Sequence, residues 1–233
     1  MQRTWLTAHS GCDSTKDNSM AFLQYAMGLE VDCIEVDVRQ DAAGILILSH
    51  DEGPADAYLA DAFAMLSGRH GMKINCDLKE DGLENRVYAL AREFEVQEQL
   101  VFSGCVSAEA AEQNPRLFMH ADWFLNIENL FPHVKTLYQA GEADTDTVIH
   151  IADGLERFIN AYAVRCLNTH YFIVHTPLYA ELMMRDIPLS LWTPDDERLI
   201  CRLLADGVFN ITTRNAKRAC ELAGRSLAKG GIA

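Results

Sequence analysis

The stretch Leu29–Val38, LEVDCIEVDV, contains the pattern from which the fold of this chain can be predicted. An extended chain directs alternate side chains to the same face, so Glu35 and Asp37 share one face of a strand over 33–38. The opposite face carries Ile34, Val36 and Val38. Two carboxylates on an inward face repel each other and are costly to desolvate, and a hard cation such as Mg²⁺ or Ca²⁺ removes both costs. A solvent-exposed alternating strand explains this pair equally well by itself.

Around this strand the chain repeats one unit, a short apolar run followed by a segment with helical spacing. The apolar runs are Thr4–Ala8, Cys33–Val38 with Ile45–Ser49, Met72–Leu78, Gln99–Ser103, Trp123–Ile127, Val164–Leu167, Ile187–Trp192 and Val208–Thr212. Such alternation predicts an α/β fold in which helices cover a parallel sheet. If the runs at 33–38 and 45–49 are two strands of one unit, the number of units favours a closed (β/α)8 TIM barrel over an open sheet.

Helix signals are clearest in three of the intervening segments, Ser19–Met27, Leu83–Phe94 and Pro194–Ala205. The first stops at Gly28, and the last has proline and acids in its first turn and Gly207 after its end. The second carries its apolar residues on one stripe, as expected of a helix that packs on a sheet. The chain contains no convincing internal repeat or linker, so we expect residues 1–233 to form a single domain.

The composition limits the classes of function. The net charge of −14 speaks against nucleic acid as a partner, because phosphate backbones are bound by excess lysine and arginine. A small phosphorylated substrate is still compatible with this charge, since a bound metal ion can supply local positive charge. Seven scattered cysteines without a CxxC pair argue against a disulfide framework and against a zinc–thiolate site.

The sequence shows no sign of a targeting or membrane segment. No stretch approaches the roughly 20 apolar residues of a membrane-spanning helix. The N-terminal residues MQRTWLTAHSG have no apolar core of signal-peptide length. We therefore expect no integral membrane segment and a cytoplasmic location.

Polar residues follow the predicted strands where the reacting groups of such barrels are found, at the C-terminal strand ends. His9-Ser10-Gly11 follows the first run, and His50-Asp51 follows the run at 45–49. Asp77 and Lys79 share one face at the end of the run at 72–78. Each of these signals is weak alone, but together with Glu35 and Asp37 they predict one polar site at this end of the barrel.

These residues resemble the motifs of the glycerophosphodiester phosphodiesterases, a family of PLC-like phosphodiesterase barrels. That family carries His-Arg-Gly, Pro-Glu-Asn-Thr, Gly-x-Asp-x-x-Glu-x-Asp-Val, His-Asp, Glu-x-Lys, Trp-Thr and Gly-Val-Asp-Gly-Ile-x-Thr-Asp. The similar stretches here are His9-Ser10-Gly11, Asp17-Asn18-Ser19, Leu29–Val38, His50-Asp51, Asp77-Leu78-Lys79, Trp192-Thr193 and Asp206–Thr213. The resemblance is strong over residues 4–51, supportive at 72–80 and 187–215, and thin between 105 and 185.

The resemblance implies a metal-dependent hydrolase that cleaves a glycerophosphodiester to an alcohol and glycerol 3-phosphate. It implies that Glu35, Asp37 and Asp77 hold a divalent cation, Mg²⁺ or Ca²⁺. It assigns acid–base chemistry to His9 and His50, because imidazoles can exchange protons near neutral pH. The substrate or its phosphate is expected to contact Lys79, Trp192 and Ser10. Asp51 would orient an imidazole or lie in the outer shell of the metal.

Three departures from the family pattern bear on the substrate. Ser10 stands where the family has an arginine, so a bidentate phosphate contact is missing there. Asp17 and Asp77 replace glutamates, so we expect that a water has to bridge Asp77 to the ion. The segment 52–76 is short where the family carries an insertion. Two alternatives therefore stay open, a phosphodiesterase or phospholipase for another headgroup, and a catalytically silent barrel that binds a phosphorylated ligand.

Other polar residues near predicted strand ends are weaker candidates. Asn126, Glu128 and Asn210 also fall near predicted strand ends. The acidic stretch Glu142–Asp146 is expected to be a solvated loop rather than a second ion site.

Overall fold

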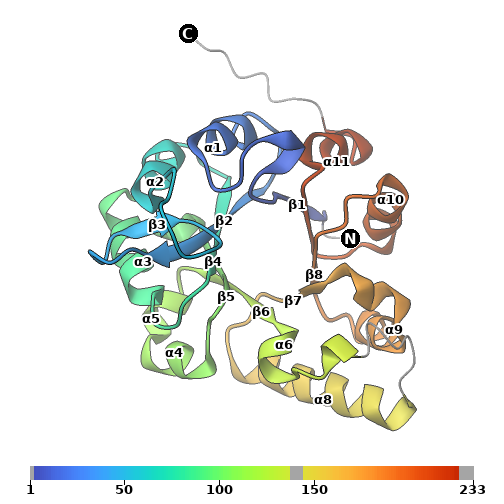
Figure 1. The fold of residues 1–233 in the computed structure, drawn as a ribbon. Coiled ribbons are helices and arrows are strands. Elements are labelled where there is room, and N and C mark those ends of the chain that lie inside the picture. The colour runs from blue at the N-terminus through green and yellow to red at the C-terminus, as the bar shows by residue number, and fades with distance from the viewer. Residues whose placement is uncertain (1–2, 137–143, 226–233) are drawn as a thin grey trace.

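Eight parallel strands close into a barrel in the computed structural model, which describes residues 3–136 and 144–225 (Figure 1). The strands are β1 (Trp5–Ala8), β2 (Cys33–Gln40), β4 (Lys73–Leu78), β5 (Leu100–Gly104), β6 (Asp122–Asn126), β7 (Cys166–His170), β8 (Leu189–Trp192) and β9 (Asn210–Thr213). The barrel closes because β1 pairs with β9 on one side and with β2 on the other. Strand β3 (Leu46–Leu48) is antiparallel to β2 and completes the same unit, as expected.

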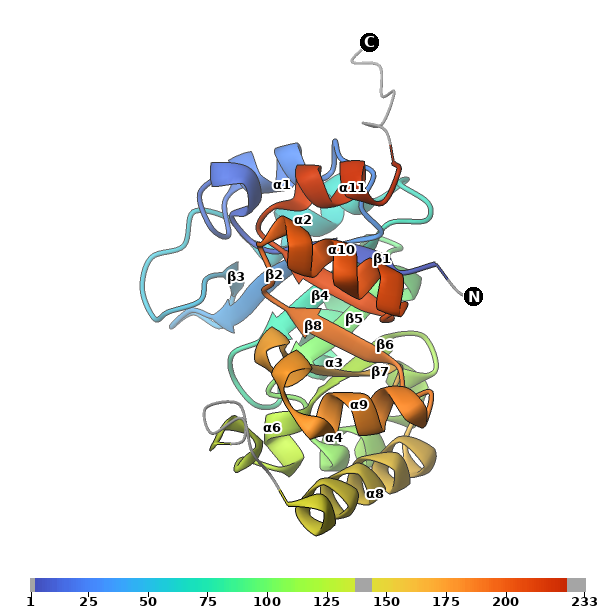
Figure 2. The same cartoon turned by 90° about the vertical axis from the view of Figure 1, so that its right-hand side faces the viewer.

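Helices surround the strands, as the side view also shows (Figure 2). They are α1 (Met20–Ala26), α2 (Leu59–Leu66), α3 (Glu84–Glu93), α4 (Ala108–Gln113), α5 (Pro115–Phe118), α6 (Ile127–Leu130), α8 (Thr145–Ala161), α9 (Pro177–Met184), α10 (Glu197–Asp206) and α11 (Ala216–Leu222). Short 3-10 turns are η1 (Cys12–Ser14), η2 (Gln97–Gln99) and η3 (Tyr171–His175). None of the helices in the described ranges is long and apolar enough to cross a membrane.

Local capping explains where the predicted helices begin and end. The Ser19 hydroxyl accepts a hydrogen bond from the Phe22 amide at the start of α1, and Asp196 does the same for Leu199 at the start of α10. Gly207 ends α10 in the left-handed conformation that a C-terminal cap requires. The three predicted helices are confirmed, although α10 begins three residues later than expected.

The acidic stretch differs from its expectation. Glu142 and Ala143 lie outside the described residues. The Asp144 carboxylate accepts a hydrogen bond from the Thr147 amide, and α8 begins at the next residue. The prediction of a loop is therefore wrong for residues 145 and 146, because Asp144 is a helix cap and acids in a first turn favour a helix.

The alternation read from 33–38 sets the two sides of the barrel wall. Ile34, Val36 and Val38 are buried in the layer between strands and helices. Glu35 and Asp37 are buried on the inner side, so neither face of β2 is exposed to bulk solvent over residues 33–38. The alternative of a solvent-exposed alternating strand is thereby excluded.

The barrel interior is apolar at the N-terminal ends of the strands and polar above. The apolar plug consists of Trp5, Cys33, Val101, Phe124, Cys166 and Phe209. Above it a chain of hydrogen bonds crosses neighbouring strands, from Thr7 to Asn210, Ser190, Asn168 and Asn126, at 2.7, 2.9, 2.8 and 2.7 Å. Because each buried polar group in this chain has a partner, the interior can be polar without a large desolvation cost. This layer forms part of the floor of the site described next.

Substitution of Ile34 tests the assignment of the outer face. We expect Ile34→Ala to lower the free energy of unfolding by about 2–5 kcal/mol, because it leaves a cavity in the strand–helix layer. Ile45, which is 50% exposed, is the control, and Ile45→Ala should change stability by no more than about 0.5 kcal/mol. Urea unfolding followed by circular dichroism measures both values. Similar losses in the two variants would contradict the assignment.

Candidate active site

A cleft of about 440 Å³ opens at the C-terminal ends of the barrel strands. It is lined mainly by polar and charged side chains, including His9, Asp17, Glu35, Asp37, His50, Asn75, Asp77, Lys79, Ser103, Asn126, Glu128, Lys135, Asn168, Trp192, Thr212 and Arg214. Reacting residues of parallel barrels occupy this end of the sheet. The structure therefore brings together in one cleft most of the residues that the sequence singled out.

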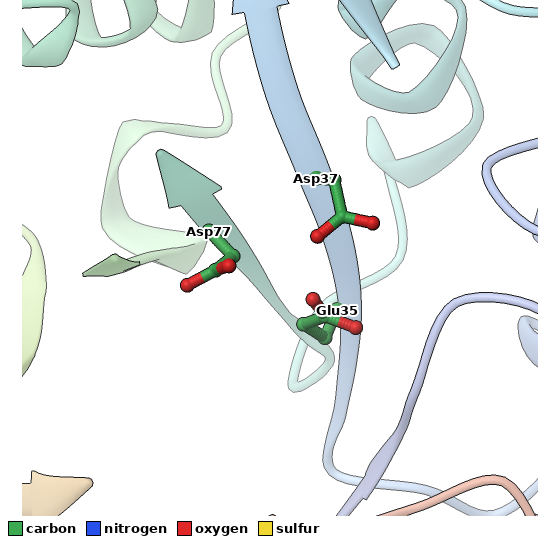
Figure 3. Close-up of side chains that lie close together, drawn as sticks. All are labelled: Glu35, Asp37 and Asp77. Atoms are coloured by element: carbon green, nitrogen blue, oxygen red, sulfur yellow. The ribbon is translucent and has the colours of Figure 1, made fainter. Parts of the chain in front are cut away.

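Three carboxylates form the centre of the cleft. Asp37 of β2 lies opposite Asp77 of β4 in the register of the two strands, and Glu35 lies two residues before Asp37 on the same face. One ligand oxygen of each carboxylate lies within 4.8 Å of the others, and Figure 3 shows the three side chains on the adjacent strands. Glu35 and Asp37 are buried and Asp77 is partly buried. The cluster predicted from the sequence is thus present in space.

Lys79 supplies the positive charge nearest to these carboxylates. Its ammonium group lies 2.7 Å from Asp37 Oδ1 and also forms an ion pair with Asp77. Burial disfavours the charged ammonium, but the two aspartates outweigh this cost and raise the pKa of Lys79. Burial would likewise raise the pKa of Asp37, yet Lys79 and hydrogen bonds from Lys79 and Asn18 hold that pKa below its usual value. The Asp37–Lys79 pair is therefore ionised.

Glu35 is in a different electrostatic position. Burial raises its pKa to about 7, the neighbouring Asp37 and Asp77 add to this effect, and His9 and the backbone amide of Ser10 oppose it. The Ser10 amide donates to Glu35 Oε2 at 3.0 Å. No cationic side chain thus fully offsets the burial of the Glu35 carboxylate, and a bound metal ion would stabilise its charged form.

Several small side chains orient the carboxylates, and the sequence argument did not assign them this role. Asn18 Nδ2 donates to Asp37 Oδ2 at 2.7 Å, and Asn18 Oδ1 accepts from the Asp37 amide at 3.0 Å. Ser103 Oγ donates to Asp77 Oδ1 at 2.6 Å. Asn18 belongs to the Asp17-Asn18-Ser19 motif, and Ser103 ends a predicted strand. Their positions at strand ends and loops are the signal that could have identified them.

The donor set fits a divalent cation on two grounds. Two oxygens bound to one Ca²⁺ lie up to about 5 Å apart, because each lies roughly 2.3–2.6 Å from the ion. The three carboxylates satisfy this limit. In addition, Asn75 Oδ1 is buried in the cleft wall and has no hydrogen-bond partner among the described residues. Asn75 lies opposite Glu35 in the strand register, so this oxygen faces the same region as the carboxylates.

Both predicted histidines line the cleft, and each has an anchored ring nitrogen. His9 Nδ1 lies 2.9 Å from the Ser10 carbonyl and 3.7 Å from Glu35 Oε2. His50 Nδ1 lies 2.9 Å from Asp51 Oδ1, which is the orienting role expected of Asp51. Carbonyl and carboxylate oxygens only accept hydrogen bonds, so Nδ1 carries the proton in both rings. Nε2 is then the atom of each neutral imidazole that can accept a proton.

The three residues expected to contact the substrate differ in whether they line the cleft. Lys79 and Trp192 line the cleft. Ser10 is fully buried, and its hydroxyl is directed at Asp37 Oδ2, 3.4 Å away. Ser10 is therefore corrected from a phosphate contact to a residue that orients the carboxylates, because it is fully buried and is not among the residues that line the cleft.

The weaker candidates also differ in whether they line the cleft. Asn126 and Glu128 line the cleft, whereas Asn210 is fully buried in the hydrogen-bonded layer beneath it. Strand ends alone could not separate these cases, because the depth of a side chain depends on how far its strand extends.

Arg214 is a cleft residue that sequence reasoning missed. Its Nη1 and Nη2 atoms donate to Asp17 Oδ1 and Oδ2, each at 2.8 Å. This hydrogen bonding lowers the pKa of Asp17 and raises that of Arg214. Gly11 lies beside the pair, where an added Cβ would stand 1.8 Å from Asp17 Oδ1 and 2.9 Å from Arg214 Nη1. The glycine of His9-Ser10-Gly11 thus leaves room for an ion pair that joins the two ends of the barrel sequence.

Solved structures with the same fold include several glycerophosphodiester phosphodiesterases. A candidate glycerophosphoryl diester phosphodiesterase from Agrobacterium tumefaciens matches with a TM-score of 0.71 at 15% identity, over 96% of this chain and 98% of that one. A phosphodiesterase from Oleispira antarctica in complex with the product sn-glycerol-3-phosphate matches with 0.63 at 17%, over 95% and 97%. The enzyme from Thermotoga maritima matches with 0.63 at 16%, over 95% and 99%. At these identities the likeness shows the fold, and it confirms the predicted barrel of this type.

No protein-family model matches the chain, and no curated protein matches it. The function of the cleft is therefore inferred from its own residues.

Substitution of Gly11 tests whether the glycine makes room for the ion pair. Gly11 and Gly68 have similar φ angles of 73° and 79°, but nothing lies within 4 Å of a Cβ at Gly68. We expect Gly68→Ala to cost about 1 kcal/mol of unfolding free energy from backbone strain alone. Gly11→Ala should cost about 1 kcal/mol more, because the Asp17–Arg214 pair must move. Equal losses in urea unfolding would show that Gly11 serves only the backbone.

Proposed function

We propose that this chain is a metal-dependent phosphodiesterase that cleaves glycerophosphodiesters to an alcohol and glycerol 3-phosphate. The observation that carries the proposal is the arrangement of the cleft: three carboxylates with ligand oxygens within 4.8 Å of one another, and two anchored imidazoles that line the same cleft. Structural likeness to glycerophosphodiester phosphodiesterases supports it at the level of the fold.

Glu35, Asp37 and Asp77 are the residues that would hold the cation, and Asn75 Oδ1 is placed to add a neutral oxygen. A divalent ion held there would polarise phosphodiester oxygens and stabilise the negative charge of the transition state. The three carboxylates lie close enough together that Asp77 could bind such an ion without the bridging water expected from its short side chain.

His9 and His50 would share the proton transfers. One neutral imidazole would accept at Nε2 the proton of the neighbouring glycerol hydroxyl as it attacks phosphorus, and the protonated partner would donate a proton to the leaving alkoxide. Water, deprotonated in the same way, would then open the cyclic phosphate to give glycerol 3-phosphate. His9 is held by the Ser10 carbonyl beside Glu35, and His50 is held by Asp51. His50 and Asp51 are exposed, so their orientation is weaker before a substrate excludes water.

A silent barrel that only binds a phosphorylated ligand is the weaker candidate. Binding an anion requires no buried, uncompensated carboxylate, and Glu35 is costly to keep for that purpose. The choice among headgroups depends on the far side of the cleft, where Trp192, Asn126 and Asn168 present one ring and two amides.

Hydrolysis of bis(p-nitrophenyl) phosphate tests the proposed chemistry. With Mg²⁺, Ca²⁺ or Mn²⁺ present, we expect turnover that falls by about 10²–10⁴-fold in the histidine variant that lacks the general base. On a glycerophosphodiester, whose alkoxide needs a proton to leave, both His9→Ala and His50→Ala should show a loss of about this size. His70 is exposed and lies outside the cleft lining, so His70→Ala is the control and should retain activity. No turnover with any cation, on this substrate and on a panel of glycerophosphodiesters, would reject the proposal.

Thermal unfolding with and without cation tests the metal site separately from turnover. We expect the cation to raise the Tm of the wild-type protein, because it binds only the folded carboxylate cluster. Glu35→Gln should abolish most of this rise, and its Tm without cation should equal or exceed the wild-type value because a buried charge is removed. Glu128→Gln, which changes the same cleft outside the cluster, should keep the rise. An unchanged rise in Glu35→Gln would contradict the assignment.

A further inference from the structure

Arg214 is unusually well fixed for a side chain at the mouth of a cleft. Its backbone amide donates to Asp195 Oδ1 at 2.8 Å, and its backbone carbonyl accepts from the Asp13 amide at 2.7 Å. The neighbouring Thr213 hydroxyl also donates to Asp195 Oδ1, at 2.8 Å. These contacts determine the direction in which the Arg214 side chain leaves the end of β9.

The guanidinium of Arg214 has capacity for a second anion. A guanidinium carries five N–H donors in a planar fork, and Asp17 accepts two of them. The Arg214 side chain is 40% exposed and lines the cleft, so the remaining edge is accessible from there. Asp17 and Arg214 line the same cleft as both catalytic candidates, His9 and His50. The ion pair therefore lies beside the proposed reaction centre.

The charge balance of the cleft gives this arginine a role. The lining contains the carboxylates of Asp17, Glu35, Asp37, Asp77 and Glu128 against the cationic side chains of Lys79, Lys135 and Arg214. Lys79 is already occupied by Asp37 and Asp77, and lysine presents a point charge rather than a fork. Ser10 does not contribute, because it is fully buried and does not line the cleft. Among the described cleft residues, Arg214 offers the one planar fork suited to phosphate oxygens.

We propose that Arg214, positioned by Asp17, is the residue of this cleft that binds the phosphate group of the substrate through its guanidinium fork. The inference rests on the proposed function for the identity of the substrate, but the phosphate contact itself needs no turnover. Arg214 follows the last strand of the barrel, β9, and would supply there the bidentate contact that is missing at Ser10, which follows the first strand, β1. Strands β1 and β9 are hydrogen-bonded neighbours, so the two positions belong to the same part of the rim.

The competing explanation is that the Asp17–Arg214 pair only ties the segment after β1 to the segment after β9. The two explanations predict different behaviour of the two partners. If the pair is purely structural, changing either partner removes the same interaction and should have the same effect. A phosphate-binding arginine loses its ligand in Arg214→Ala, whereas Asp17→Asn removes a carboxylate that repels phosphate and still offers an oxygen to the guanidinium.

Calorimetric titration with inorganic phosphate, in the presence and absence of Mn²⁺, distinguishes these cases. We expect Arg214→Ala and Arg214→Lys each to weaken phosphate binding about tenfold or more, since a charge-assisted fork is lost. Asp17→Asn should bind phosphate at least as tightly as the wild-type protein. The Arg218–Glu197 pair is the matched control, with exposures of 42% and 53% against 40% and 52% for Arg214 and Asp17. Arg218→Ala and Glu197→Gln should leave phosphate binding unchanged.

Three results would overturn the inference: equal weakening in Asp17→Asn and Arg214→Ala, no change in Arg214→Ala, or no phosphate binding by the wild-type protein. Thermal unfolding of every variant checks that a loss of phosphate binding does not come from a folding defect. The outcome is separable from that of the proposed function. Phosphate binding that depends on Arg214, without turnover, would reject the hydrolase proposal and support the anion site. Turnover together with phosphate binding that does not depend on Arg214 would support the hydrolase proposal and reject the anion site.

Discussion

Repulsion among Glu35, Asp37 and Asp77 is the constraint on which the rest of the site depends. The barrel wall brings these carboxylates together because β2 and β4 pair with Asp37 opposite Asp77. Each neighbour then offsets part of the cost: Lys79 pairs with the two aspartates, and Asn18 holds Asp37 by two hydrogen bonds. The compensation is incomplete at Glu35, whose pKa stays raised by burial. A bound divalent cation is the simplest completion of this arrangement.

The barrel interior divides the cleft into two chemically different sides. The strands β2 and β4 supply the carboxylates, whereas β6 and β7 supply the amides of Asn126 and Asn168, which a hydrogen bond joins. A bound phosphodiester would thus meet the cation site on one side and neutral donors on the other. Arg214 stands where the two sides meet, at the rim near β1 and β9. This division would let an acidic protein bind the proposed anionic substrate without a basic surface.

Much of the fold could be predicted because its signals are local. The alternation at 33–38, the caps at Ser19 and Asp196 and the strand-end histidines each depend on a few adjacent residues. Arg214 could not be found in this way, because its meaning depends on Asp17, 197 residues away, and on closure of the barrel. Asn75 was within reach, since it shares the strand face of Asp77. Ser10 was misplaced because residue order does not show which side chain lies behind another.

The central claim is that Glu35, Asp37 and Asp77 bind one divalent cation. The most direct measurement is the anomalous diffraction of crystals grown with Mn²⁺, which locates the ion independently of any activity. We expect one strong peak in the cleft, within about 2.0–2.4 Å of an oxygen from each of the three carboxylates. We also expect that the Lys79 ammonium moves away from at least one aspartate, because two cations cannot share that space. A peak that touches neither Glu35 nor Asp37 would contradict the account.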